Sequence, residues 1–115
     1  MWRIEIDELP PTLNKFYSSP HWSYRDKQVK YWHERFHWAF KEAKLPKLNW
    51  PVTLSTTQYC KGKLRDVDNT AIGAKFASDA LVKGEWLPDD SPKYIERLIL
   101  ESKKGKENKI VILIQ

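Results

Sequence analysis

The stretch that decides the fold runs from Pro51 to Asp90, PVTLSTTQYCKGKLRDVDNTAIGAKFASDALVKGEWLPDD. It opens with β-branched residues from Val52 to Tyr59, which predict a strand. After a basic run, apolar residues return at helical spacing from Asp68 to Lys83 and predict a helix. Gly84 then ends the helix and a Pro-Asp-Asp turn follows. The stretch is therefore predicted to fold as strand, loop, helix and turn.

Residue patterns outside this stretch predict three more strands and one more helix. Alternation predicts strands at Trp2 to Asp7 and at Lys93 to Glu101, and an apolar run predicts a last strand from Asn108 to Gln115. Apolar residues at helical spacing predict a helix from Ser23 to about Lys44. The order β-α-β-α-β-β predicts an α+β fold, with a mixed sheet of about four strands and two helices.

The length and composition limit the class of protein. At 115 residues the chain fits one domain, residues 1–115, and 41% hydrophobic residues exclude a disordered chain. Cys60 has no partner for a disulfide, which agrees with a reducing compartment. The longest apolar run, Ile110 to Ile114, is too short to cross a membrane. The acidic residues near the N-terminus do not fit a signal peptide, so we expect a cytoplasmic protein.

Asp66 and Asp68 precede the helix that starts near Asp68. On an extended chain, two residues that are two apart point to the same side and lie roughly 6.5–7 Å apart, a spacing that can bracket a divalent cation. A third carboxylate could come from Asp89 or Asp90 in the turn. The alternative is structural, with Asp68 as a helix N-cap and Asp89 and Asp90 as ordinary turn residues.

The helix from Asp68 to Lys83 separates into two faces when residues are placed at 100° intervals. The apolar face comprises Ala74, Phe76, Ala77, Ala80 and Leu81. The other face combines charged residues with one isoleucine and comprises Asp68, Ile72, Lys75 and Asp79. A solvated face could look the same. However, lysine before aspartate is the weaker order for an ion pair four residues apart, so helix stabilisation explains this stripe poorly.

Basic residues indicate an anionic partner, because the chain carries a net charge of +5. Lys61, Lys63 and Arg65 recur at every second position and would form a ladder on an extended chain. A second group, Lys103, Lys104 and Lys106, is predicted to form a hairpin turn. Solvated charges on an edge strand are the simpler explanation of the ladder.

The segment from Thr12 to Ser23 has neither helical nor strand periodicity and is predicted to be a long loop. It contains Asn14 and Lys15 among aromatic residues, a mixture that could hold a nucleic-acid backbone and stack on unpaired bases. Aromatic side chains that anchor the loop to the core are the alternative. In the following helix, His33 and His37 have a metal-binding spacing but no third ligand nearby in the sequence, so solvated or packed histidines are expected.

Three motifs in this order resemble those of the RusA family of Holliday junction resolvases, small endonucleases of phages and prophages. The first is Leu9-Pro10-Pro11-Thr12-Leu13-Asn14, and the second is Arg65-Asp66-Val67-Asp68-Asn69. The third is Lys75-x3-Asp79-Ala80-Leu81, which leads to Asp89-Asp90. Together these motifs span most of the chain.

The resemblance implies a homodimer that cuts four-way DNA junctions by paired symmetric incisions in recombination and repair. It implies Mg²⁺ or Mn²⁺ held by Asp66, Asp68 and Asp90, with Lys75 as a catalytic lysine. Asp79 and Asp89 would be supporting groups. The DNA-binding residues expected from charge and position are Asn14, Lys15, Lys61, Lys63, Arg65, Lys103, Lys104 and Lys106. No membrane and no small-molecule cofactor are expected.

Lys75 departs from the best-known form of the family motif, because it follows Asp68 by seven residues rather than four. Three extra residues turn a helix by about 300°, which keeps Lys75 on the same face but moves it about 4.5 Å along the axis. Two other functions remain open. One is a non-catalytic nucleic-acid-binding module, and the other is a nuclease for flaps or other branched DNA.

Overall fold

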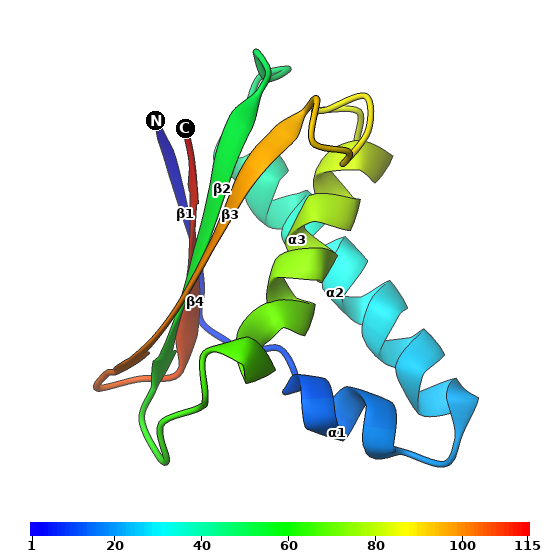
Figure 1. The fold of residues 1–115 in the computed structure, drawn as a ribbon, viewed down its shortest axis with the longest axis vertical. Helices are drawn as coiled ribbons and strands as arrows, with labels where there is room; N and C mark the ends of the chain where they lie inside the picture. Colours follow the sequence, from blue (N-terminus) through cyan, green and yellow to red (C-terminus); the bar gives the residue numbers. More distant parts are fainter.

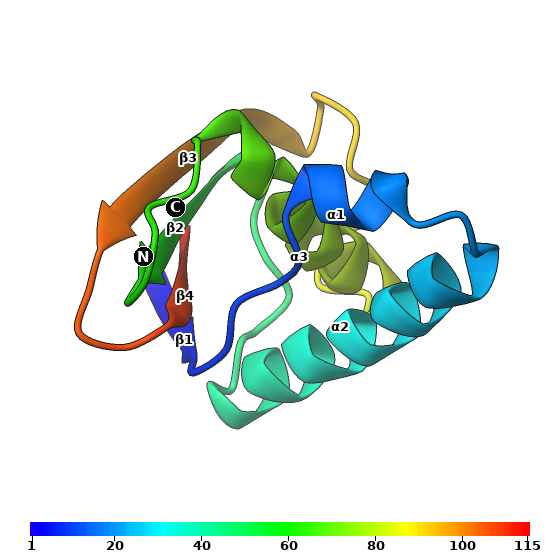
Figure 2. The same cartoon turned by 90° about the horizontal axis from the view of Figure 1, so that it is seen from below.

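The computed structural model describes all 115 residues and places three α-helices on one side of a four-stranded sheet (Figure 1). The elements in chain order are β1 (Trp2–Ile6), α1 (Leu13–Ser18), α2 (Trp22–Glu42), β2 (Val52–Cys60), the 3₁₀-helix η1 (Asp68–Thr70), α3 (Ala71–Lys83), β3 (Ile95–Lys104) and β4 (Lys109–Ile114). The α+β class predicted from the sequence is confirmed. The other face of the sheet has no helix over it (Figure 2).

The sheet has the strand order β1-β4-β2-β3. Strand β4 pairs antiparallel with both β1 and β2, whereas β2 and β3 run parallel. The predicted hairpin at Lys103 to Lys106 is therefore wrong, because β2 lies between β3 and β4. Lys103 and Lys104 belong to β3 itself, and the chain crosses from one edge of the sheet to its centre. The apolar β4 takes the inner position, and the more polar β3 takes the edge.

The core lies between the sheet and helices α2 and α3. Trp32, Phe36 and Phe40 of α2 are buried, and they belong to one hydrophobic cluster with buried side chains of β2 and β4. Phe40 also contacts Trp86, whose indole N–H donates a hydrogen bond of 2.8 Å to the Leu45 carbonyl. The core is thus rich in aromatic residues. It fixes α3 between α2 and the sheet.

The loop predicted from Thr12 to Ser23 is wrong in its first half, because Leu13–Ser18 form α1. The Thr12 side chain caps this helix by accepting a 3.1 Å hydrogen bond from the Lys15 backbone N–H. Phe16 is buried and its ring packs edge-on against Phe76 of α3. A helix of six residues is too short to show a clear period, so its cap was the only sequence signal.

The predicted helix from Asp68 to Lys83 is present as η1 followed by α3, but its polar face is narrower than predicted. Ile72 is buried, whereas Lys75 on the same predicted stripe is exposed. The physical reason is that α3 packs against both α2 and the sheet, so two of its sides are covered. None of the helices has the length and apolar character needed to cross a membrane.

Candidate functional site

Two of the three motifs lie in contact although 55 residues separate the bonded groups. The Arg65 guanidinium donates a 2.6 Å hydrogen bond to the Pro10 carbonyl. The Asn69 side-chain oxygen accepts a 2.9 Å hydrogen bond from the Asn14 backbone N–H. Each motif therefore holds the other in position at the N-terminal end of α3. We call this region, residues 9–14 with residues 65–70, the paired-motif site.

Arg65 is a structural residue of the paired-motif site. Its guanidinium also donates to the Gln58 Oε1 at 2.8 Å, and the Gln58 amide donates to the Thr70 carbonyl at 3.4 Å. Gln58 is fully buried. The burial of the Arg65 guanidinium lowers the pKa of Arg65 from its usual value. The predicted ladder of Lys61, Lys63 and Arg65 is therefore wrong, because the chain bends after β2 and Arg65 turns inward.

Asp66 and Asp68 are both exposed at the paired-motif site. The extended conformation predicted for them is wrong, because Val67 has helical dihedrals of φ −59° and ψ −46°. The turn is closed by a 3.0 Å hydrogen bond from the Asn69 N–H to the Asp66 carbonyl. The Thr70 hydroxyl and N–H both donate to the Val67 carbonyl. The main chain of Asp66 and Asp68 is thus fixed by local hydrogen bonds. The carboxylates of these two residues form no ion pairs.

Lys75 and Asp79 lie one turn apart on α3, as predicted. The Lys75 Nζ is 3.5 Å from the Asp79 carboxylate, and the same carboxylate oxygen is 3.9 Å from the His33 Nε2 of α2. The second distance is too long for a hydrogen bond. Burial lowers the pKa of His33, and the Asp79 carboxylate offsets this effect only in part.

Asp89 and Asp90 are exposed in the connection that leaves the C-terminal end of α3. Asp66 and Asp68 precede the N-terminal end of the same helix, and its 13 residues correspond to about 20 Å. Figure 1 shows the two connections at opposite ends of α3. No three His, Cys, Asp or Glu side chains of one chain form a group that could hold a metal ion. A single chain thus does not assemble the predicted set of Asp66, Asp68 and Asp90.

The remaining predicted DNA-binding residues lie in α1, in the segment after β2, at the end of β3 and between β3 and β4. Asn14 and Lys15 are in α1, where both side chains are exposed. The Lys61 backbone N–H donates to the Asn108 side chain, and the Lys104 ammonium donates to the Gly62 carbonyl. Lys103 pairs with Glu101 at 3.5 Å, whereas Lys63 and Lys106 have no ion-pair partner.

A groove of about 520 Å³ adjoins the paired-motif site. Pro10, Lys15 and Arg65 line it from the motifs, and Tyr24 and Tyr31 line it from α2. The tyrosines could not be assigned to this place from the sequence, because only the packing of α2 brings them there. The hydroxyl of Tyr31 donates a 2.6 Å hydrogen bond to Glu8, which raises the pKa of Tyr31.

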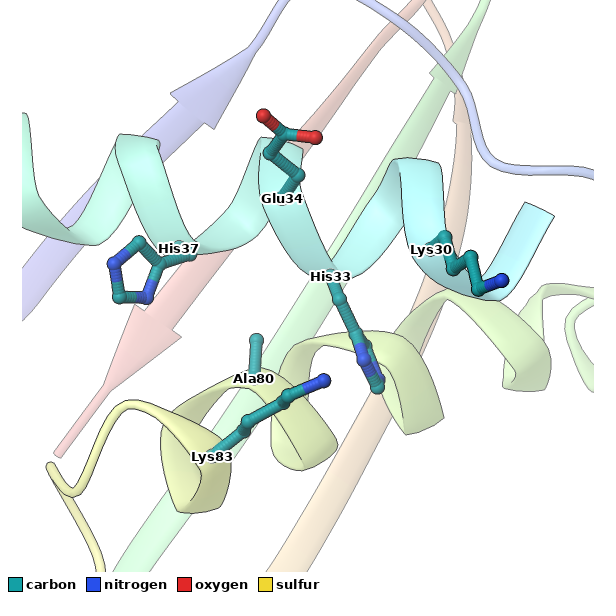
Figure 3. A pocket seen from close by; sticks show the side chains of 6 residues that line it. All are labelled: Lys30, His33, Glu34, His37, Ala80 and Lys83. Carbon is teal, nitrogen blue, oxygen red and sulfur yellow. The ribbon is translucent and has the colours of Figure 1, made fainter. Parts of the chain in front are cut away.

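A second cavity of about 390 Å³ lies between α2 and α3 (Figure 3). Its lining includes Lys30, His33 and His37 from α2, and Ala80 and Lys83 from α3. Figure 3 shows the Lys83 ammonium directed toward the His33 ring. The two histidines contact other side chains, since the His37 ring lies 5.4 Å from the Trp86 ring and the His33 Nε2 lies 3.9 Å from the Asp79 carboxylate.

Comparison of the sequence with protein-family models gives no match, and comparison with curated proteins gives none either.

Proposed function

We propose that this protein is a metal-dependent endodeoxyribonuclease that cuts branched DNA, with four-way junctions as its preferred substrate. The observation that carries the proposal is the contact between the first and second motifs, through Arg65 with Pro10 and Asn69 with Asn14. This contact holds two exposed, unpaired carboxylates beside a groove. Two motifs that are distant in the sequence but meet at one site support a common chemical role. Their presence in the sequence alone is weaker support.

The surroundings of the site fit a phosphodiester substrate. The exposed Lys15 lines the adjoining groove, and the exposed Lys63 follows the end of β2. Cationic side chains of this kind bind the DNA backbone without reading its sequence. Lys75 would then stabilise the charge that develops on the scissile phosphate. The Lys75 side chain is 59% exposed in its ion pair with Asp79, so the ammonium is available to an approaching phosphate.

The requirement for Mg²⁺ or Mn²⁺ rests on the resemblance to the RusA family and on the chemistry of carboxylates. Asp66 and Asp68 offer hard oxygen ligands of the kind that such ions prefer. Asp90 completes the predicted ligand set only if a second chain supplies it, since one chain keeps it at the other end of α3. Paired incision by a homodimer is therefore part of the same proposal.

Cleavage of labelled DNA tests this proposal. Four-way, flap and linear duplex substrates of matched length are incubated with the protein in Mg²⁺, in Mn²⁺ or in EDTA. Cleavage of the four-way junction in either metal and its loss in EDTA is the expected result. Preferential cutting of flaps would replace the junction with another branched substrate. The Asp68→Asn variant, purified in the same way, controls for a contaminating nuclease.

A non-catalytic DNA-binding module is the second candidate, and one observation favours it. The three predicted ligands do not meet in one chain, and Asp68 begins η1 as a turn residue would. In this case the protein would shift a four-way junction in a gel with the same affinity in Mg²⁺ and in EDTA. No cut strand would appear at any protein concentration.

A further inference from the structure

Strand β1 is a free edge of the sheet, because it pairs only with β4. Alternate residues of such a strand direct their backbone N–H and C=O groups away from the sheet, where no strand bonds them. Ile4 and Ile6 are buried in the core. Arg3 and Glu5 alternate with them and therefore lie on the other face of the sheet, which has no helix over it (Figure 2). The side chains of β1 thus leave its backbone edge accessible to a further strand.

A groove runs along this edge, between β1 and the C-terminal half of α2. One hollow of about 380 Å³ is lined by residues 3–7 and, across from them, by residues of α2 that include Ala39 and Ala43. A second hollow of about 320 Å³ adjoins it and shares Arg35 and Trp38 with it. We call the two hollows together the β1 groove. Residues 3–7 span about 13 Å as a strand and residues 35–43 about 12 Å as a helix, so the two walls have similar lengths.

Helix α2 presents one stripe of side chains to the β1 groove. Glu34, Trp38 and Glu42 are spaced four residues apart, which places them on one face of the helix, and all three line the groove. Trp38 is 56% exposed, and both glutamates are exposed. Figure 3 shows the Glu34 carboxylate on the side of α2 that is turned away from α3. The stripe is therefore an aromatic ring between two carboxylates.

The β1 groove has no free cation to balance these carboxylates, which form no ion pair within the chain. Its two arginines are already paired, Arg3 with Glu5 at 2.9 Å and Arg35 with Glu8 at 3.3 Å. The uncompensated charge of the groove is thus negative, although the whole chain carries +5. A negative groove favours a cationic occupant and disfavours the phosphates of DNA.

The spacing of the stripe matches an extended peptide. Glu34 and Glu42 are eight helical residues apart, which corresponds to about 12 Å along α2. In an extended chain, residues i, i+2 and i+4 point to one face and span about 13 Å. A peptide with a cationic residue, an apolar residue and a second cationic residue at these positions can therefore place its cations at the two carboxylates and its apolar side chain on Trp38.

We propose that the β1 groove binds a partner protein through an extended cationic segment, which adds to the free edge of β1 as a fifth strand of the sheet. Main-chain hydrogen bonds to β1 supply affinity in this mode of recognition, and the side chains of alternate residues supply specificity. The segment has the pattern cation-x-apolar-x-cation on the face that meets α2. This interface is independent of the nuclease activity, because it uses none of the aspartates of the paired-motif site.

A synthetic peptide tests the charge pattern. Fluorescein-labelled Thr-Lys-Thr-Leu-Thr-Lys-Thr is titrated with the wild-type protein and followed by fluorescence anisotropy. Binding should saturate with a dissociation constant below about 1 mM, and the peptide with glutamate in place of both lysines should not bind. No saturable binding of the lysine peptide, or equal binding of the two peptides, would overturn the proposal.

Protein variants locate the binding site with the same lysine peptide. The double variant Glu34→Lys and Glu42→Lys should weaken binding by about tenfold or more, whereas Glu96→Lys, an exposed acid on the edge strand β3, should not change it. Trp38→Ala should weaken binding by about tenfold, and Trp22→Ala, which removes another exposed tryptophan of α2, is its matched control. Equal effects of a variant and its control would place the peptide elsewhere.

Methylation of the peptide backbone distinguishes strand addition from attraction between charges. In a strand that pairs on one side only, alternate residues direct their N–H groups to the partner. N-methylation of the lysine and leucine residues, or of the threonine residues, should therefore abolish binding for one set and leave it within about threefold for the other. Equal effects of the two sets would refute strand addition.

Single-stranded DNA is the competing occupant of a groove that contains an exposed tryptophan. Labelled oligothymidine is titrated with the wild type and with Trp38→Ala. We expect no difference between the two proteins. DNA binding that is lost in Trp38→Ala, together with displacement of the lysine peptide by the DNA, would overturn the peptide interface and make the groove a nucleic-acid site.

Discussion

The two ends of α3 are held in place by different forces. At the N-terminal end, hydrogen bonds through Arg65, Gln58 and Asn69 join segments that are distant in the sequence. At the C-terminal end, Trp86 and Leu87 pack into the core, and the acidic connection beyond them is exposed. A polar network fixes the position of functional groups more strictly than an apolar contact does, because each hydrogen bond requires a particular distance and direction between its two partners. The difference favours the N-terminal end as the location of the proposed site.

The largest expected effect is on cleavage. Asp68→Asn, or Asp66→Asn, should lower the cleavage rate by at least about 10³-fold, equivalent to about 4 kcal/mol, while junction binding stays intact or tightens. The reason is that a proposed ligand and a negative charge near the phosphate are lost together. The rate is measured in single-turnover assays on a four-way junction. Asp7→Asn, which changes an exposed acid just after β1, should cut at the wild-type rate.

The same assay compares the two ends of α3. Asp90→Asn should match Asp68→Asn, and Asp89→Asn should be milder. A wild-type rate for Asp90→Asn would confine the site to the N-terminal end of the helix and remove the need for a second chain.

Lys75→Ala should reduce the cleavage rate by about 10²- to 10³-fold, the range for one group that stabilises charge in a transition state. The fold should be retained, because Lys75 is exposed. Lys83→Ala, at the other end of the same helix, is the matched control and should change the rate only a few-fold. If both variants behaved alike, the lysine at the longer spacing would have no special role.

The strands and the long helices could be predicted from the sequence because their signals are local. The β-branched run from Val52 predicted β2, and the helical period of aromatic residues predicted α2. The neighbour of each strand could not be predicted, since the placement of β4 between β1 and β2 depends on contacts over the whole chain. A basic segment such as 103–106 can belong to a hairpin turn or to a connection between strands that are not neighbours in the sheet. Its composition does not distinguish the two.

The site was predicted in part for the same reason. Lys75 and Asp79 share a face at helical spacing, and the structure places them together. Arg65 was assigned to DNA, whereas it bonds Pro10 and Gln58, which come from two other segments. Single-sequence spacing contains no information about such distant partners. The role of Gln58, a polar residue in the middle of a buried strand, could have been anticipated, because a buried amide needs partners.

Arg65→Met tests the polar network directly and should lower the free energy of unfolding by about 2–3 kcal/mol, since a buried acceptor of Gln58 and the Pro10 carbonyl lose a charged donor. Urea denaturation monitored by tryptophan fluorescence measures the change. Lys63→Met, an exposed charge two residues away, should change it by no more than about 0.5 kcal/mol. If Arg65→Met and Lys63→Met changed the free energy of unfolding equally, the polar network would contribute no more to stability than an exposed charge does.

Gly73→Ala probes the packing at the same end of α3. In an exposed helix interior this change usually stabilises by about 0.5–1 kcal/mol. Here the added Cβ would lie 2.7 Å from the Gln58 Nε2 and 3.0 Å from the Pro10 Cγ. Because Gln58 is held by Arg65 and Thr70, we expect destabilisation of about 1–2 kcal/mol. Gly62→Ala, with no atom within 4 Å, is the control and should be neutral. A stabilised Gly73→Ala variant would show that Gln58 can move freely.

The smallest effect concerns pH and the contact between α2 and α3. Burial lowers the pKa of His33 below its usual 6.5, with Asp79 acting to raise it and Lys75 and Lys83 to lower it. The unfolded chain therefore binds a proton first as the pH falls, so the stability from a neutral His33 is complete above pH 6.5 and declines below it. His33→Gln should flatten the fall in the free energy of unfolding between pH 7.5 and 5.5, as followed by urea titration. His21→Gln, an exposed control, should keep the wild-type slope. An unchanged slope in His33→Gln would mean that His33 titrates alike in both states, and that its proximity to Asp79 compensates fully for burial.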